Sequence, residues 1–242
     1  MTMNRSIEGL IRLREHDLAE KQADIKAELQ KRHPDIRDFS LKGRLPQAGG
    51  VQNREAILPP LSAETQKLVE HMKHDGYVVY ETTSRSPASL RSDGMHYWFL
   101  NDKLADIIAS PALLAFKKAP SEFFLPGSQN IVHDEQVKLF PEEQVKVDRK
   151  YPGAGLVVKE GKLPEWTEVA LKHFKATGVR IFGRDYGCNY TWTDTYGSEK
   201  PGAYRARFGR WLGAFGANVN LWPPGDVYPD LGLASLVEIP RK

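Results

Sequence analysis

Cysteine is nearly absent from this sequence, which contains Cys188 alone among its 242 residues. One cysteine cannot form a disulfide within the chain, so nothing indicates an oxidising compartment. Long apolar runs are absent as well, and none approaches the roughly 20 residues that span a bilayer. The charged N-terminal residues also lack the apolar core of a signal peptide. We therefore expect a cytoplasmic protein that is not associated with a membrane.

The sequence also lacks the short motifs that mark common catalytic and nucleotide-binding sites. It contains neither a phosphate-binding P-loop nor a G-x-S-x-G nucleophile elbow. Gly153-Ala154-Gly155 lacks the third glycine and the strand-to-helix context of a dinucleotide-binding fingerprint. We expect no cofactor, and the motifs leave open whether the chain is an enzyme.

Metal-ligating and nucleophilic residues are few. His71 and His74 would share a helix face, but the sequence offers no third ligand nearby. We interpret them as surface histidines and expect no metal site. Cys188, between a glycine and an asparagine, fits a small packed residue or a nucleophile with a distant histidine, and its role stays open.

The composition is that of an ordinary globular protein, with 40% hydrophobic and 27% charged residues. The length suits one medium domain with extensions, which can bury a sizeable core without cross-links. A net charge of +3 is too small to indicate a polyanionic partner by itself, although a local basic patch remains compatible with it.

The N-terminal residues 4–32 predict a long amphipathic helix that ends at His33-Pro34. Apolar residues recur along it at helical spacing, at Ile7, Leu10, Ile11, Leu18, Ile25 and Leu29. This narrow stripe fits an arm docked on its own domain, or one that self-associates or binds a partner, because an isolated helix is marginal in water. For association we select Ile7, Ile11, Leu18, Ile25 and Leu29.

Residues 34–62 predict a linker, because prolines and glycines interrupt them and their apolar residues follow no period. So long a connection is unusual inside a compact domain. The chain therefore divides into an arm at 1–33, a linker at 34–62 and one globular domain at 63–242. That domain ends in an aromatic, arginine-rich β unit at 177–239.

Helices and strands mix in the globular domain without regular βα alternation. Helices are expected at 63–75 with Ser62 as N-cap, after Asn101, at 134–140, and from Pro164 to the cap Gly178. A further helical turn is expected from Pro111. Strands are expected at 77–80, 95–100, 123–125, 156–158, 179–182, 190–195, 204–208, 219–221 and 233–239. The pattern predicts an α+β fold with a mixed or antiparallel sheet and packed helices.

The C-terminal unit contains two alternating runs around a turn. In the first, Tyr190, Trp192 and Asp194 alternate with threonines; in the second, Tyr204, Ala206 and Phe208 alternate with Arg205 and Arg207. The alternation predicts a hairpin with one aromatic face and one threonine and arginine face. The W-T-x-T run at 192–195 and the closing run ASLVEI at 234–239 resemble the ends of C-type-lectin-like modules over about fifty residues. The cysteines of those modules are lacking, so the resemblance assigns no family and no residue role.

This unit also holds the candidate ligand-binding residues. They are Arg184, Asp185, Tyr190, Trp192, Asp194, Arg205, Arg207 and Trp222. Arginine binds carboxylates and phosphates through two parallel hydrogen bonds, and aromatic rings offer flat faces to sugars, bases or partner side chains. The set therefore suits an anion-binding groove. Alternatively, the aromatic residues are core and the arginines pair with Asp185 and Asp194.

Two functional hypotheses follow. We favour a non-enzymatic binding or assembly protein that associates with itself or a protein partner through the N-terminal helix. The alternative is an enzyme that acts on a phosphorylated or nucleic-acid substrate, with the arginine-rich hairpin as its anion-binding site. The loop 82–94, with Arg85 and Arg91, either covers such a groove or is an ordinary solvated loop. Under the binding hypothesis, replacing both hairpin arginines by Gln should barely change the melting temperature and should abolish affinity for an anionic ligand or partner, since exposed ion pairs contribute only about 0–1 kcal/mol.

Overall fold

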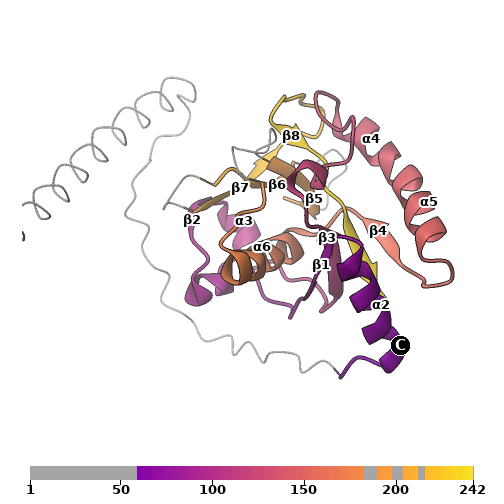
Figure 1. Cartoon of the computed structure of the whole chain (residues 1–242). Helices are drawn as coiled ribbons and strands as arrows, with labels where there is room; N and C mark the ends of the chain where they lie inside the picture. The colour runs from indigo at the N-terminus through magenta and orange to yellow at the C-terminus, as the bar shows by residue number, and fades with distance from the viewer. Residues whose placement is uncertain (1–58, 183–189, 198–203, 212–215, 242) are drawn as a thin grey trace, which may run out of the picture. The chain divides into compact units, whose positions relative to one another are not determined.

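The computed structural model describes residues 59–182, 190–197, 204–211 and 216–241 (Figure 1). These residues belong to the second of the two units, 1–52 and 53–242, into which the chain divides. They form helices and two separate β-sheets, one antiparallel and one mixed. The fold is α+β, as the sequence predicted. The predicted arm and most of the predicted linker lie outside the described residues.

The helices of the described part are short, apart from three that pack on the sheets. They are α2 (Ala63–His74), α3 (Asp102–Ala105), α4 (His133–Gln136), α5 (Phe140–Lys150) and α6 (Leu163–Thr177), with the 3-10 turns η1 (Ser89–Asp93), η2 (Pro120–Glu122) and η3 (Val137–Leu139). None of the described helices combines the length and the apolar character that crossing a bilayer requires.

Local sequence explains where the main helices begin and end. The Ser62 hydroxyl accepts a hydrogen bond from the Thr65 N–H and so caps α2, as expected. Pro164 occupies the first turn of α6, where a missing N–H costs nothing. Gly178 ends α6 with a φ of 72°, a left-handed conformation that glycine adopts without a steric penalty.

The antiparallel sheet has the strand order β1-β3-β9-β4. Its strands are β1 (Tyr77–Glu81), β3 (Leu113–Lys117), β9 (Leu236–Ile239) and β4 (Val157–Lys159). Successive side chains of a strand point to opposite faces. Accordingly, Leu114 and Phe116 of β3 join the cluster around α6, whereas Leu113 and Ala115 join the cluster that contains α2 residues. The sheet is therefore covered on both faces.

The mixed sheet has the order β2-β7-β6-β5-β8. Its strands are β2 (Tyr97–Leu100), β7 (Ala217–Trp222), β6 (Arg205–Gly209), β5 (Tyr190–Tyr196) and β8 (Leu231–Gly232). The strands β5, β6 and β7 are antiparallel to their neighbours in this set, while β2 and β8 add parallel pairs at the two edges. The predicted hairpin thus forms the middle of a larger sheet.

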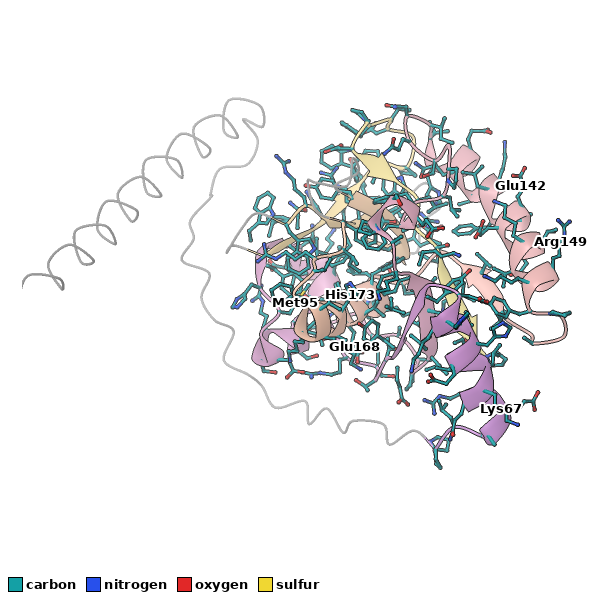
Figure 2. The ribbon with its side chains drawn as sticks, in the orientation of Figure 1. Lys67, Met95, Glu142, Arg149, Glu168 and His173 are labelled. Atoms are coloured by element: carbon teal, nitrogen blue, oxygen red, sulfur yellow. The ribbon has the colours of Figure 1, made fainter. Side chains whose placement is uncertain are left out.

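The largest cluster of buried residues surrounds α6, which lies beside strands of both sheets (Figure 1). Trp166 and Val169 of α6 pack with Leu114 of one sheet and Phe208 of the other. Burying a large apolar side chain stabilises the fold by about 1.5–3 kcal/mol. Figure 2 labels His173 on α6, and Glu142 and Arg149 on the outward side of α5. Helix α6 therefore joins the two sheets into one core.

Three local predictions were wrong. The run after Pro111 is the strand β3 and not a helical turn, because a continuous apolar run fits a doubly buried strand as well as a helix. Residues 123–125 form only an isolated bridge at Phe124. Residues 179–182 form no strand: Ile181 and Phe182 are buried in a turn, and Phe182 has a φ of 62°.

Candidate functional site

The register of the hairpin decides which side chains lie together. Trp192 of β5 pairs with Arg207 of β6, and Arg205 pairs with Trp222 of β7. Directly opposed residues point to the same face of a sheet. The arginines therefore share a face with the tryptophans and with Tyr190. We call this set of Tyr190, Trp192, Arg205, Arg207 and Trp222 the arginine face.

The predicted partition into an aromatic face and a threonine and arginine face was therefore wrong. Alternation determines which residues of one strand share a face, but it does not determine the pairing between strands. Thr191 lies opposite Phe208, and both are buried. The Thr191 hydroxyl accepts a hydrogen bond from the Ala234 N–H at 2.9 Å, which explains how a polar residue occupies the core side.

The arginine face is largely buried. Arg205 and Arg207 have relative exposures of 6% and 8%, and Trp192 is fully buried. Leu139 and Phe140, where η3 meets α5, pack against the same cluster as Tyr190 and Trp192. Asp194 is exposed and lies 3.9 Å from Arg205, at the margin of the set. The other candidates, Arg184 and Asp185, lie outside the described residues, as does Cys188.

Both Nη groups of Arg205 are engaged by the protein itself. Its Nη1 donates to Glu160 Oε2 at 2.5 Å and to the Thr193 carbonyl at 3.3 Å, and its Nη2 donates to the Tyr196 hydroxyl. The second partner of Glu160 is His133, whose Nε2 lies 3.1 Å from Oε1. The Glu160 and His133 side chains are also buried. Arg205 therefore belongs to a closed ionic network.

Glu160 is the residue that the sequence interpretation missed. From the sequence, the alternative to ligand binding was that the arginines form ion pairs with Asp185 and Asp194, which are close to them in the chain. The principal described partner of Arg205 is instead separated from it by 45 positions. No local pattern marks Glu160, since it lies between β4 and α6 and reaches the sheet only through the tertiary fold.

Arg207 occupies a different environment on the same strand. Its guanidinium carbon lies 3.9 Å from the centre of the Trp222 ring and 4.2 Å from that of Tyr190. No hydrogen bond or ion pair joins it to any residue of the described ranges, and its Nε is buried without an acceptor. Loss of hydration on burial lowers the pKa of Arg207, with the charge of Arg210 acting in the same direction.

Other N–H donors of the arginine face are also buried without an acceptor among the described residues. Among the described residues, Trp192 Nε1, Trp222 Nε1 and Arg205 Nε are also buried without acceptors. Most buried polar groups in proteins are hydrogen-bonded, so each exception requires an explanation. These atoms are all donors. The face is therefore suited to an oxygen-rich group or to ordered water.

Tyr190 adds a hydroxyl to the face. Burial raises its pKa, against the opposing effect of the positive charges of Arg207 and Arg210, so the phenol is neutral near pH 7. Asp230 is close enough to Arg207 for its charge to raise the arginine pKa, in opposition to desolvation. The charges of Arg210 and Asp230 therefore act on the stacked guanidinium in opposite directions.

A second polar site lies at a cavity of about 100 Å³ between the segment after β1 and the middle and C-terminal part of α6. Its groups satisfy one another. Glu168 accepts from the Thr83 N–H at 2.9 Å and pairs with Lys172 at 2.7 Å, and Arg85 pairs with Asp93. Leu90 anchors the loop 82–94 in the cluster around α6, on the opposite side of the five-stranded sheet from the arginine face. The loop therefore does not cover that face.

The two histidines of α2 are exposed and lie 3.4 Å (His71) and 3.8 Å (His74) from the nearest carboxylate oxygens of Asp75. Within the described ranges, no group of three or more histidine, cysteine, aspartate or glutamate residues is arranged to hold a metal ion.

Comparison with known proteins adds no assignment, because no family model, curated protein or solved structure matches the chain.

Proposed function

We propose that the chain is a non-enzymatic binding protein that holds an anionic group of a ligand or partner on the arginine face. The observation that carries the proposal is Arg207, a buried guanidinium with no acceptor among the described residues. Arginine is rarely buried unless it is paired, because an unpaired buried charge loses its hydration without compensation. A bound anion supplies the missing partner.

Arg205 provides the internal comparison. It lies two positions away on the same strand and the same face, and it is equally buried. Its charge is neutralised by Glu160, and its Nη groups donate to three oxygens. A bound anion would add little charge compensation at Arg205 and most at Arg207. The expected site is therefore centred on Arg207.

The stacking also restricts how an anion approaches. Strand order places Arg207 on β6, between Tyr190 on β5 and Trp222 on β7. The rings therefore flank the guanidinium, and its faces are occupied by cation–π contacts. All guanidinium N–H bonds lie in its plane. With Nε enclosed, the edge that carries the two Nη groups is the part that an anion can reach.

The enzymatic alternative shares this anion site but has less support. Glu160 and His133 are buried acid–base groups that contact the arginine face. Glu160 accepts from Arg205 and hydrogen-bonds to His133, whose ring meets Trp192 edge to face. Both side chains have relative exposures below 10%, at 8% and 4%. Groups engaged in this way serve the fold, whereas general acid–base catalysis needs a group within reach of the substrate.

The proposal includes association through the N-terminal arm. Its basis is the apolar stripe in the sequence, formed by Ile7, Ile11, Leu18, Ile25 and Leu29. A helix with such a stripe is stabilised mainly by packing it against another surface.

The first prediction is that small anions stabilise the full chain through Arg207. Sodium acetate and sodium phosphate are each compared with sodium chloride at equal ionic strength, and the melting temperature is followed by scanning calorimetry. A ligand that binds only the folded state at about 100 times its Kd adds about 2.7 kcal/mol of stability. We expect acetate or phosphate to raise the melting temperature of the wild type, and Arg207→Gln to abolish that rise.

Arg149→Gln is the matched control, because it removes the same charge from an exposed position on α5 (Figure 2). It should retain the full anion effect. An anion effect of the same size in Arg207→Gln as in the wild type contradicts the proposal, as does its absence from the wild type.

A further inference from the structure

We infer that the group held at Arg207 is a single carboxylate and not a phosphate, an inference that rests on the proposed function. Both anions accept two parallel hydrogen bonds from a guanidinium edge. They differ in charge and in shape, and the surroundings of Arg207 discriminate on both counts.

The local charge matches one negative charge. Arg207 interacts electrostatically with Asp230, which raises its pKa, and with Arg210, which lowers it. These three groups sum to one positive charge, since Tyr190 is neutral. A carboxylate balances that sum, whereas a phosphate group carries about −1.5 to −2 at neutral pH. The excess negative charge would be held at the buried Arg207 side chain, where uncompensated charge is costly.

The shape of the site also favours a planar group. The Trp222 and Tyr190 rings flank the guanidinium with centres at 3.9 and 4.2 Å from its central carbon, so an anion that extends the guanidinium plane avoids the rings. A carboxylate is planar and places both oxygens in that plane. A tetrahedral phosphate projects oxygens out of the plane toward the ring faces, whose electrostatic potential is negative.

The walls of the site beyond the guanidinium are aromatic. Trp222 meets Tyr228 edge to face, with ring centres 5.4 Å apart, and both pack against the cluster that includes Leu231. Such walls suit a carboxylate on an apolar or aromatic stem. A small organic acid and an acidic side chain of a protein partner share this chemistry, and the test separates these two sources.

The probe is the side-chain Nε–H resonance of Arg207 in ¹⁵N-labelled full chain. This N–H is buried, has no acceptor in the described part of the chain and belongs to a guanidinium stacked between two rings, so it should exchange slowly and show a large ring-current shift. The disappearance of this resonance from the spectrum of the Arg207→Lys variant assigns it to Arg207. The Arg205 Nε–H is the internal control, because the Nη groups of Arg205 already donate to Glu160, Thr193 and Tyr196.

Three probes are titrated against sodium chloride at constant ionic strength: sodium phenylacetate, inorganic phosphate, and a blocked Leu-Glu-Leu peptide with its Leu-Gln-Leu twin. We expect a saturable shift of the Arg207 resonance with phenylacetate, with the Glu peptide, or with both, and a shift with phosphate at least about tenfold weaker. Loss of one charge-assisted hydrogen bond corresponds to about tenfold or more in affinity. Arg207→Lys keeps the positive charge but cannot donate two parallel hydrogen bonds to a carboxylate. It should therefore weaken carboxylate binding by about tenfold, as followed by calorimetric titration.

Asp230→Asn adds one positive charge to the site, so it should narrow the preference for carboxylate over phosphate. Binding of the Glu peptide alone identifies a protein partner as the source, and binding of phenylacetate alone identifies a small acid. Phosphate binding as tight as that of the carboxylates overturns the carboxylate inference and leaves the anion site standing. If none of the three anions shifts the resonance, both the carboxylate inference and the proposed function fail.

Discussion

At the scale of single residues, two arginines on one strand differ in whether their buried charge is compensated by a carboxylate. Arg205 neutralises a buried carboxylate, whereas Arg207 lacks a described acceptor and is held by two aromatic rings. Breaking a buried ion pair by removing one partner costs about 3–5 kcal/mol, because the other charge remains buried. A cation–π contact contributes about 0.5–2 kcal/mol, and removing an unpaired buried charge offsets part of that loss.

We therefore predict that Arg205→Gln lowers the free energy of unfolding by about 3–5 kcal/mol and that Arg207→Gln changes it by less than about 2 kcal/mol. Urea denaturation of each variant in a buffer without added anion measures both. The sequence expectation that replacing both would barely change the melting temperature drew on the small contribution of exposed ion pairs, whereas both side chains are buried.

Glu160→Gln supplies the control for this prediction. In the double variant with Arg205→Gln no uncompensated carboxylate remains, so its loss of stability should be smaller than the sum of the two single losses. Strictly additive losses, or a small loss in Arg205→Gln, would show that the ionic network does not stabilise the fold.

At the scale of elements, α6 carries a buried histidine between the two sheets. His173 is 3% exposed, and its Nδ1 lies 3.0 Å from the Tyr80 hydroxyl. Its ring also meets Phe116 edge to face at 5.3 Å. Burial lowers the pKa of His173 below 6.5, and the nearby charge of Lys118 acts in the same direction. In the folded state the ring is therefore neutral at a pH where the unfolded chain would protonate it.

From this depressed pKa we predict that acidification destabilises the protein through His173. The unfolded state binds the proton more readily, so the free energy of unfolding falls as pH drops through the unfolded pKa toward the lower folded value. The stabilising contribution is fully present above about pH 6.5, the unperturbed pKa. Melting temperatures measured from about pH 8 to about pH 5 should decline in the wild type.

His173→Gln is the comparison, since it cannot take up a proton in this range. Its decline over the same pH range should be shallower than that of the wild type, because its other titrating groups are unchanged. Parallel curves for the two proteins would exclude His173 as a source of the acid sensitivity.

The elements also show what a local pattern can and cannot predict. The caps of α2 and α6 were predicted correctly, because a serine before a helix and a left-handed glycine after it act through neighbouring backbone groups. The strand β3 was missed because it is buried on both faces and so shows no alternation. The burial of such a strand comes from partners that are distant in the sequence.

At the scale of the whole molecule, the domain and the arm are expected to be separable. The described residues bury two large hydrophobic clusters between their own helices and sheets. A core of this kind supports independent folding. We therefore predict that removing residues 1–58 leaves a domain that unfolds cooperatively in urea, and that the shortened chain has a lower association state than the full chain.

Light scattering measures the second part of this prediction, and a full chain with Leu18→Asp and Ile25→Asp gives an independent readout. Both proteins should have a lower mass per particle than the wild type. A shortened chain that is insoluble or lacks a cooperative transition would place the arm within the core, and a wild type that is already monomeric at high concentration would exclude self-association.

The sequence by itself determined the α+β class, the caps of α2 and α6 and the strands of the C-terminal hairpin, because these depend on periodicity and on contacts between near neighbours. It did not predict α5, whose residues 140–150 follow the short helix expected at 134–140. It also indicated that the tyrosines, tryptophans and arginines of that hairpin belong together. Only the tertiary structure decided the pairing that places Trp192 opposite Arg207, since a shift of register by one residue exchanges the two faces. It likewise brought Glu160 to Arg205 across 45 positions of chain and left Arg207 between two rings. Which arginine has a carboxylate partner and which has no acceptor among the described residues is a property of that packing, and identical side chains two residues apart carry no local sign of it.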